Sequence, residues 1–374
     1  MVAGRGCAVP PGVDPERAWP CLARELSARR TPVSALTNAI ARLAAGEDLR
    51  AVDMKEALAV VMGGAGTPAQ IGALLMGLRV KGETVEEIVA VAEVLRDLST
   101  PVTVADPDRL IDTCGTGGDG ASTFNISTAT ALVCACAGAK VAKHGNRSVS
   151  SRSGSADVLE AAGAVLTLTP AQVAQCIDQV GVGFLFAPRH HEAMRHAAGP
   201  RRELGIRTLF NMLGPLTNPA HAARQLVGVF SSDLLEPFAY ALAALGGHHA
   251  LVVHSDDGLD EISPAAATEV CEMKNGVLSR YRLAPADFGL PAGGLDALKV
   301  DSADSSLDVL RQVLSGRDQG PAAVAVALNA GAALYVAGLV ADIRTGVAHA
   351  QALLRDGRPA AKLDEFVAFT RGLA

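Results

Sequence analysis

The sequence predicts an α/β protein in which a small all-helical domain precedes a larger α/β domain with a mainly parallel central sheet. Residues 32–100 show only helical periodicity, whereas after Pro101 short apolar runs alternate with glycine turns and Ala-rich helical runs. Such alternation is typical of βα units on a parallel sheet. The chain has 374 residues, enough for two to three domain-sized units with substantial hydrophobic cores.

Residues 1–31 contain several prolines and mixed charges but no charged segment followed by an apolar one, so they do not resemble a signal peptide. We expect a loosely ordered N-terminal extension. From residue 32 the helical domain begins, with apolar residues recurring every three or four positions. These residues are Val33, Leu36, Ile40 and Leu43, followed by Met54, Leu58, Val61 and Met62.

Two helix starts are marked within this domain. Thr67 followed by Pro68 fits an N-cap residue with proline at the first helical position, and Thr84 with Glu87 has capping-box spacing. We expect the helical domain to span residues 32–100. Part of 190–219 is expected to join it, because the proline-containing stretch 199–219 interrupts the βα pattern.

The larger domain is expected over residues 101–374, with strands predicted at 110–112, 164–166, 225–230 and 250–254. Residues 321–340 have the length of a membrane span, but they are rich in Ala and Gly and include Asn329. They also lack flanking basic asymmetry and an aromatic belt. We therefore expect a buried helix and no membrane association.

Composition excludes several classes of protein. The formal net charge is −6 and no block of Lys and Arg occurs, which argues against a general polyanion binder and a nucleic-acid partner. The seven cysteines include no CxxC pair or zinc-type spacing. A reduced cytoplasmic protein fits this pattern best.

A glycine cluster is the densest chemical signal. It runs through residues 112–120 as DTCGTGGDG, after a predicted strand and before an Ala-rich helix. Glycine N–H groups and a helix N-terminus together can hold a phosphate. A tight βα turn is the alternative for this cluster taken alone. The P-loop pattern is absent, and we assign neither a P-loop nor a Rossmann fingerprint to this cluster.

Two further clusters point to an acidic ligand. Residues 143–155 hold three fixed cations and five serines, which favours an anion-binding loop over a merely polar surface loop. Residues 254–263 hold four carboxylates after a predicted strand, a group suited to Mg²⁺ bridging to phosphates but also compatible with a charged turn. In the cluster at residues 143–155, His144 is either a general base or a residue that positions substrate.

Together these motifs resemble the anthranilate phosphoribosyltransferase family, whose fold is shared with pyrimidine nucleoside phosphorylases. The resemblance covers about residue 32 to the C-terminus. It rests on CGTGGDG from Cys114, FNIST from Phe124, KHGNRSVSSRSGSADVLEAAG from Lys143, RRELGIRTLFNMLGPLTNP from Arg201, DGLDEIS from Asp257 and NAGAALYVAG from Asn329.

The resemblance implies transfer of a phosphoribosyl group from phosphoribosyl pyrophosphate (PRPP) to the amine of anthranilate, with Mg²⁺, as a step of tryptophan biosynthesis. It also implies a homodimer. The implied PRPP residues are Gly115, Gly118, Asp119, Thr123, Asn125, Ile126, Ser127, Thr128, Lys143, His144, Gly145, Asn146, Arg147, Ser148, Val149, Ser150, Ser151 and Ser155. The implied anthranilate residues are Gly115, His144, Asn146 and Arg201, and the implied magnesium ligands are Ser127, Asp260 and Glu261.

Three of these residues, Lys143, His144 and Arg201, are expected to act in catalysis. Arg201 suits the anthranilate carboxylate because a guanidinium pairs with a carboxylate through two hydrogen bonds. Two other functions compete. A nucleoside phosphorylase of the same fold would need a phosphate site and a base pocket, and a PRPP sensor would not need the metal and acceptor residues together.

Overall fold

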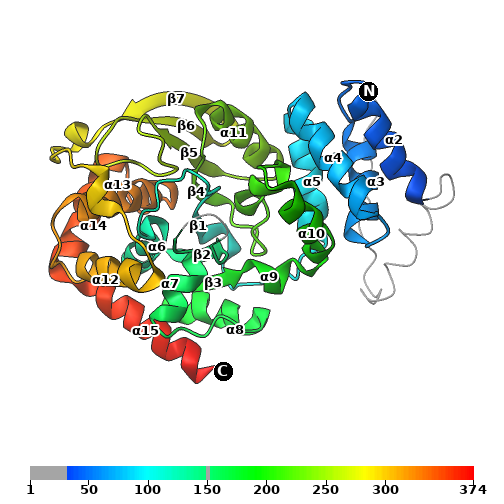
Figure 1. Ribbon diagram of the computed structural model, residues 1–374. Coiled ribbons are helices and arrows are strands. Elements are labelled where there is room, and N and C mark those ends of the chain that lie inside the picture. Colours follow the sequence, from blue (N-terminus) through cyan, green and yellow to red (C-terminus); the bar gives the residue numbers. More distant parts are fainter. Residues whose placement is uncertain (1–31, 149–151) are drawn as a thin grey trace, which may run out of the picture.

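The computed structural model describes residues 32–148 and 152–374 (Figure 1). The predicted extension over 1–31 and three of the expected PRPP residues, Val149, Ser150 and Ser151, lie outside the described residues.

Four helices form a bundle at the start of the described chain, as the periodicity predicts. Both expected helix starts are capping boxes: the Thr67 side chain accepts from the Gln70 N–H, and the Thr84 side chain accepts from the Glu87 N–H. The helices are α2 (Pro32–Ala44), α3 (Ala51–Met62), α4 (Pro68–Lys81) and α5 (Val85–Asp97).

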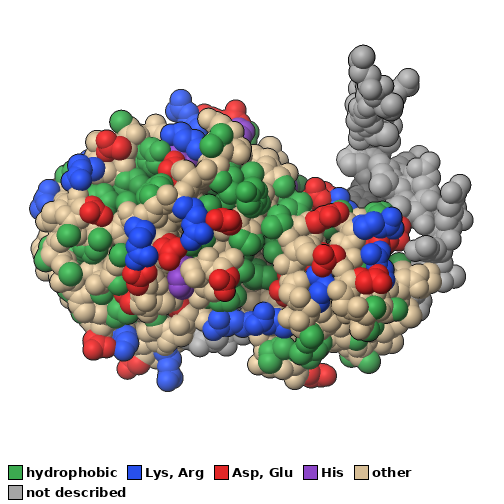
Figure 2. Space-filling view, turned by 90° about the horizontal axis from the view of Figure 1, so that it is seen from above, with side chains coloured by type: hydrophobic (Ala, Val, Ile, Leu, Met, Phe, Trp, Pro, Cys, Tyr) green, Lys and Arg blue, Asp and Glu red, His purple; other side chains and the backbone are tan. Residues whose placement is uncertain are grey.

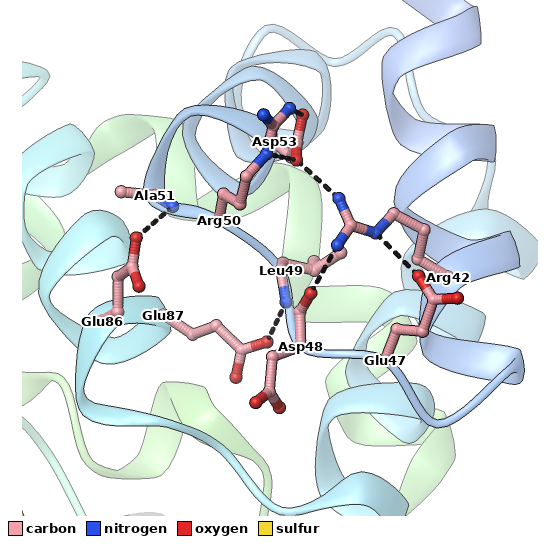
Figure 3. Close-up of polar contacts among 9 residues, drawn as sticks. All are labelled: Arg42, Glu47, Asp48, Leu49, Arg50, Ala51, Asp53, Glu86 and Glu87. Carbon is pink, nitrogen blue, oxygen red and sulfur yellow. Dashed lines mark hydrogen bonds and ion pairs between the residues drawn. The ribbon is translucent and has the colours of Figure 1, made fainter.

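Carboxylates of α5 cap the chain where it enters α3 (Figure 3). The buried Glu87 accepts from the N–H of Leu49 at 2.8 Å, and Glu86 accepts from the N–H of Ala51 at 2.9 Å. The Leu49 N–H precedes α3, and its contact is buried, so Glu87 satisfies a donor that burial would otherwise leave unpaired. Ala51 is the first residue of α3, and its N–H has no partner inside the helix. Both contacts also fix α3 against α5.

Helix α10 (Arg195–Leu204) packs against α4 and α3, although it lies about a hundred residues further along the chain (Figure 1). The chain crosses between the bundle and the α/β part at two nearby places. The Thr100 N–H donates to the carbonyl of His190, and the Val102 N–H donates to that of Pro219. We keep the division at residue 100, with part of 190–219 in the helical domain, as a proposal.

The described residues form one seven-stranded sheet in the order β3-β2-β1-β4-β5-β6-β7. The first five strands in this order are parallel, and β5, β6 and β7 pair antiparallel. The predicted fold class is therefore confirmed. The strands are β1 (Leu110–Gly115), β2 (Lys140–Gly145), β3 (Val182–Phe186), β4 (Arg224–Gly228), β5 (His249–Ser255), β6 (Thr268–Lys274) and β7 (Val277–Leu283).

Helices cover both faces of this sheet. One apolar core lies between the sheet and α6, α12, α13, α14 and α15, and the other runs from the far face of β4 to β6 through α11 into the helical bundle. The remaining helices are α6 (Ile126–Cys136), α7 (Ser155–Ala161), α8 (Pro170–Gln175), α9 (Ala187–His190), α11 (Leu235–Ala244), α12 (Ala303–Leu314), α13 (Pro321–Val336), α14 (Ile343–Asp356) and α15 (Arg358–Gly372).

One predicted strand is wrong. Residues 164–166 are a loop before α8, and the position beside β2 is taken by β3. The apolar run is nevertheless explained by burial, since Ala164 and Leu166 both lie in the core. The Val165 N–H bonds to the Thr370 hydroxyl at 3.1 Å instead of to a strand.

The segment with the length of a membrane span is a helix inside the protein, because nearly all of α13 is buried in the α/β core. Among the described residues no helix is long and apolar enough to cross a membrane. On the face shown in Figure 2, Lys and Arg side chains are interspersed with Asp and Glu rather than gathered into a stripe.

Candidate active site

The three sequence clusters meet at the carboxyl edge of the parallel strands. β1 ends at Gly115, β2 at Gly145, β4 at Gly228 and β5 at Ser255. The chain runs from β1 outward through β2 and β3, then returns to β4 on the other side of β1. Open α/β sheets bind ligands where the strand order reverses in this way, because the following loops diverge and leave a crevice.

The carboxylate loop approaches the glycine cluster closely. A Cβ at Gly228 would lie 1.5 Å from the Asp260 carbonyl oxygen, and one at Gly115 would lie 2.5 Å from Asp260 Oδ2. The Gly117 N–H donates to the same Oδ2 at 2.8 Å. The two glycines are therefore required so that a carboxylate can reach the end of β1.

The half-buried Asp260 and Glu261 carboxylates lie close to each other and to further negative charge. Burial and the nearby Asp119 raise the pKa of Asp260 to about 7, and burial together with Asp260 raises the pKa of Glu261 well above its usual range. The Ser127 backbone N–H bonds to Glu261. A hydroxyl and two carboxylates with excess negative charge are a donor set that fits Mg²⁺.

This donor set is incomplete as a metal site. Within residues 32–148 and 152–374, no three His, Cys, Asp or Glu side chains form a ready metal-binding group. Mg²⁺ commonly completes its coordination with water and substrate phosphates. The arrangement therefore suits a metal that arrives with, or is shared with, a phosphate ligand.

Lys143 supplies positive charge beneath the glycine cluster. Its ammonium is buried and donates to the Thr113 carbonyl at 2.6 Å and to Ser127 Oγ at 3.2 Å. Burial lowers the pKa of Lys143, whereas Asp112 opposes that shift. Asp112 in turn accepts from the His144 N–H at 3.2 Å, so β1 and β2 are joined at the site.

His144 is held as a neutral ring. Its Nδ1 lies 2.9 Å from the Gly214 carbonyl, so Nδ1 carries the proton and Nε2 carries a lone pair. Burial, with the neighbouring His191, lowers the pKa of His144 to about 3. Among the described residues nothing bonds to Nε2. The ring therefore keeps one buried acceptor atom without a hydrogen-bond partner among the described residues.

Arg201 lies on α10, the helix that packs against the helical bundle. Its guanidinium lies 5.2 Å from the centre of the Phe210 ring, and burial lowers its pKa. The neighbouring Arg202 is exposed. Phe210 and Gly214, the partner of His144, belong to one short segment. That segment therefore contacts two of the four residues expected on the acceptor side, His144 and Arg201.

The serine-rich loop is arranged differently from what its composition indicates. The Arg147 guanidinium pairs with Glu160 at 2.5 and 2.8 Å, so a carboxylate on α7 offsets part of its charge. Asp157 Oδ2 accepts from the N–H groups of Ser148 and Gly154, both at 2.9 Å, which closes the loop at its base. Sequence reasoning missed Asp157.

The other expected residues lie around the same edge. Ile126 and Thr128 are buried, so their side chains face the core and not the crevice. Asn125 is the N-cap residue of α6, and Thr123 makes a β-bridge with Lys299. Asn146 and Ser155 are joined through the Asn146 carbonyl, which the Ser155 hydroxyl contacts at 3.3 Å. Gly118 adopts a positive φ of 81°.

Arg207 was also missed. Its guanidinium lies 4.6 Å from the centre of the Phe230 ring and donates to the Gly118 carbonyl. Arg207 belongs to the sequence motif that begins at Arg201. Its place in that motif is the one feature of the sequence that could have identified it as a site residue.

The helical bundle and the α/β domain are the two domains of the glycosyl transferase family. Residues 37–99 match the helical bundle domain of the glycosyl transferase family, and residues 107–360 match its α/β domain. An anthranilate phosphoribosyltransferase from Methylococcus capsulatus is 55% identical over 332 residues, covering 89% of this chain and 97% of the relative.

Solved structures agree. Anthranilate phosphoribosyltransferase from Thermus thermophilus superposes with a TM-score of 0.84 at 43% identity, covering 89% of this chain and 99% of the other. The Saccharomyces cerevisiae enzyme in complex with PRPP and Mg gives 0.82 at 27% identity, covering 91% and 98%. The chain belongs to the anthranilate phosphoribosyltransferase family.

Proposed function

We propose that the protein transfers the 5-phosphoribosyl group of PRPP to the anthranilate amine in a Mg²⁺-dependent reaction that releases pyrophosphate. The observation that carries this is the meeting of the glycine cluster, Lys143 and the Asp260 and Glu261 carboxylates at one sheet edge. A donor with several phosphates needs N–H donors, a fixed cation and oxygen ligands for a metal together.

The donor residues act by holding the leaving group. Backbone N–H groups of the glycine cluster and the N-terminal end of α6 would bind its phosphates, and Lys143 would stabilise the charge that grows on pyrophosphate. Ser127, Asp260 and Glu261 would hold Mg²⁺, which when bound neutralises phosphate charge. The Ile126 and Thr128 side chains would support this segment from the core.

The acceptor residues align the amine. Arg201 would pair with the anthranilate carboxylate. The neutral His144 would accept a hydrogen bond from the amine at Nε2, which orients the nitrogen lone pair toward the anomeric carbon. An aromatic amine is already largely neutral at pH 7, so this alignment supplies most of what the acceptor needs. Between the two roles expected for His144, its low pKa favours positioning over proton removal.

The test is loss of anthranilate fluorescence with purified protein, PRPP and Mg²⁺, beside reactions that omit PRPP or contain a chelator. Loss that requires both PRPP and the metal supports the proposal. Anthranilate that persists while calorimetry shows PRPP binding would contradict it and favour a sensor. Phosphate-dependent cleavage of a pyrimidine nucleoside would favour the phosphorylase instead.

The quaternary structure and compartment follow the family resemblance. We propose a cytoplasmic homodimer with no nucleic-acid or membrane partner. Sedimentation equilibrium at micromolar protein concentration tests the dimer, and a single species of monomer mass would contradict it.

A further inference from the structure

Ser306 contacts the segment that is expected to bind PRPP, although it lies 181 residues further along the chain than its partner Asn125. It is on α12, near the N-terminal end of that helix, and its side chain is fully buried. We propose that Ser306 is a positioning residue that orients the Asn125 side-chain amide for the phosphoribosyl donor. This inference rests on the proposed function.

The directions of the hydrogen bonds determine how the amide is turned. The Asn125 backbone N–H can only donate, and it does so to Ser306 Oγ at 3.1 Å. The Ser306 hydroxyl hydrogen is therefore available for the Asn125 side chain, whose nearest atom, Oδ1, lies 2.7 Å away. Oδ1 at that position accepts the hydroxyl hydrogen, whereas an NH₂ group there would compete for the Oγ lone pairs and leave the hydroxyl hydrogen without this acceptor.

A second hydroxyl supports the same orientation. Ser153 Oγ donates to Asn125 Oδ1 at 2.8 Å, and Asn125 Nδ2 donates to the Ser153 carbonyl at 3.3 Å. Oδ1 thus accepts two hydrogen bonds while Nδ2 uses one of its two hydrogens on the protein. The second Nδ2 hydrogen is the one the amide can offer to an anionic ligand.

The backbone around Asn125 is held by the same part of the chain. The Phe124 N–H donates to the Leu298 carbonyl at 2.8 Å, and the Val300 N–H donates to the Ser122 carbonyl at 2.9 Å. The segment before α12 therefore aligns the donor-binding segment, and Ser306 adds the side-chain orientation. Without its hydroxyl, the amide could turn and present its oxygen to a phosphate, which would repel it.

The variant Ser306→Ala tests this inference, with Ser305→Ala as the matched control. Ser305 Oγ accepts from the N–H groups of Asp301 and Ser302 at 3.3 and 3.1 Å, so its loss weakens the start of α12 without touching Asn125. We expect Ser306→Ala to raise the KM for PRPP about tenfold, as loss of one buried hydrogen bond at a ligand-orienting group would. The KM for anthranilate should change less than twofold.

A double-mutant cycle separates positioning from packing. In an Asn125→Ala background, Ser306→Ala should add nothing to the KM for PRPP, although it should still lower the melting temperature. Equal effects of Ser306→Ala in both backgrounds would overturn the inference. So would a KM for PRPP that matches the Ser305→Ala control.

Two precautions keep the result decisive. If Ser306→Ala does not fold, Ser306→Cys keeps nearly the same volume with a weaker donor, and an unchanged KM for PRPP in that variant would overturn the inference. Wild-type protein that consumes no anthranilate would overturn the proposed function and this inference with it. Normal wild-type turnover with an unaffected serine variant would overturn the inference alone.

Discussion

Replacement of Gly228 by alanine should separate the carboxylate loop from the end of the sheet. The new Cβ would lie 1.5 Å from the Asp260 carbonyl oxygen, whereas an ordinary contact begins at 3.4 Å. The obstacle is backbone, so no side-chain rotation relieves it, and the loop must move by about 2 Å. A misplacement of about 1 Å at a reacting centre can reduce the rate about a hundredfold.

We therefore expect Gly228→Ala to lower kcat/KM at least about a hundredfold and to destabilise the fold by about 1–3 kcal/mol, the usual range for overpacking. The assay is anthranilate fluorescence at several Mg²⁺ concentrations, with urea unfolding for stability. Gly72→Ala is the matched control, because nothing lies within 4 Å of its Cβ and it sits in helix α4. That variant should be about 0.5–1 kcal/mol more stable than wild type.

A Gly228→Ala enzyme within threefold of wild-type kcat/KM and with unchanged stability would refute this reasoning. Gly115→Ala provides a graded comparison. Its Cβ would clash with the Asp260 side chain and make only an ordinary contact, at 3.5 Å, with the Asp260 carbonyl oxygen. The side chain can rotate away at the cost of its bond to the Gly117 N–H. Its loss of activity should be smaller than that of Gly228→Ala.

Three further predictions concern single side chains. Arg201→Ala should raise the KM for anthranilate at least about tenfold more than the KM for PRPP, because a charged hydrogen bond is lost. The control Arg202→Ala should change neither KM. Equal effects of Arg201→Ala on both KM values would contradict its role. The folded pKa of His144 lies near 3, below its ordinary 6.5, so its contribution to stability is complete above pH 6.5 and decreases toward pH 3. The unfolding free energy of wild type relative to His144→Gln should therefore fall by up to about 1.4 kcal/mol per pH unit between pH 6 and 5, and parallel curves would show that the ring is not buried neutral. The Asn329 side chain hydrogen-bonds to both the N–H and the carbonyl of Ile262, at 3.0 and 2.9 Å. Asn329→Ala should therefore lower the free energy of unfolding, measured in urea, by about 2–4 kcal/mol. A decrease under about 0.5 kcal/mol would exclude this role.

Local patterns were sufficient for the fold class. Apolar spacing and capping boxes at Thr67 and Thr84 mark helices because these signals depend only on neighbours three or four residues away. Alternating strand and helix runs predict a parallel sheet for the same reason. The apolar run at 164–166 shows the limit of such patterns. A buried segment has the same apolar composition whether it is a loop or a strand of the sheet.

The sequence by itself determined the chemical classes available at the site. Glycines in the 112–120 cluster, the cations of 143–155 and the carboxylates near Asp260 were recognisable because residue type limits which ligands can be bound. Their individual roles stay predictions. The family followed from the order of those motifs along the chain, and the comparisons with known proteins confirm it.

Only the tertiary structure decided which polar groups are available to a ligand and which are already paired inside the protein. Arg147 is paired with Glu160, His144 is neutral, and Asn125 is oriented by Ser306 from a segment with no recognisable motif. These properties depend on burial and on partners far away in the chain. A linear pattern contains neither, because desolvation and hydrogen-bond direction arise only when distant segments are packed together.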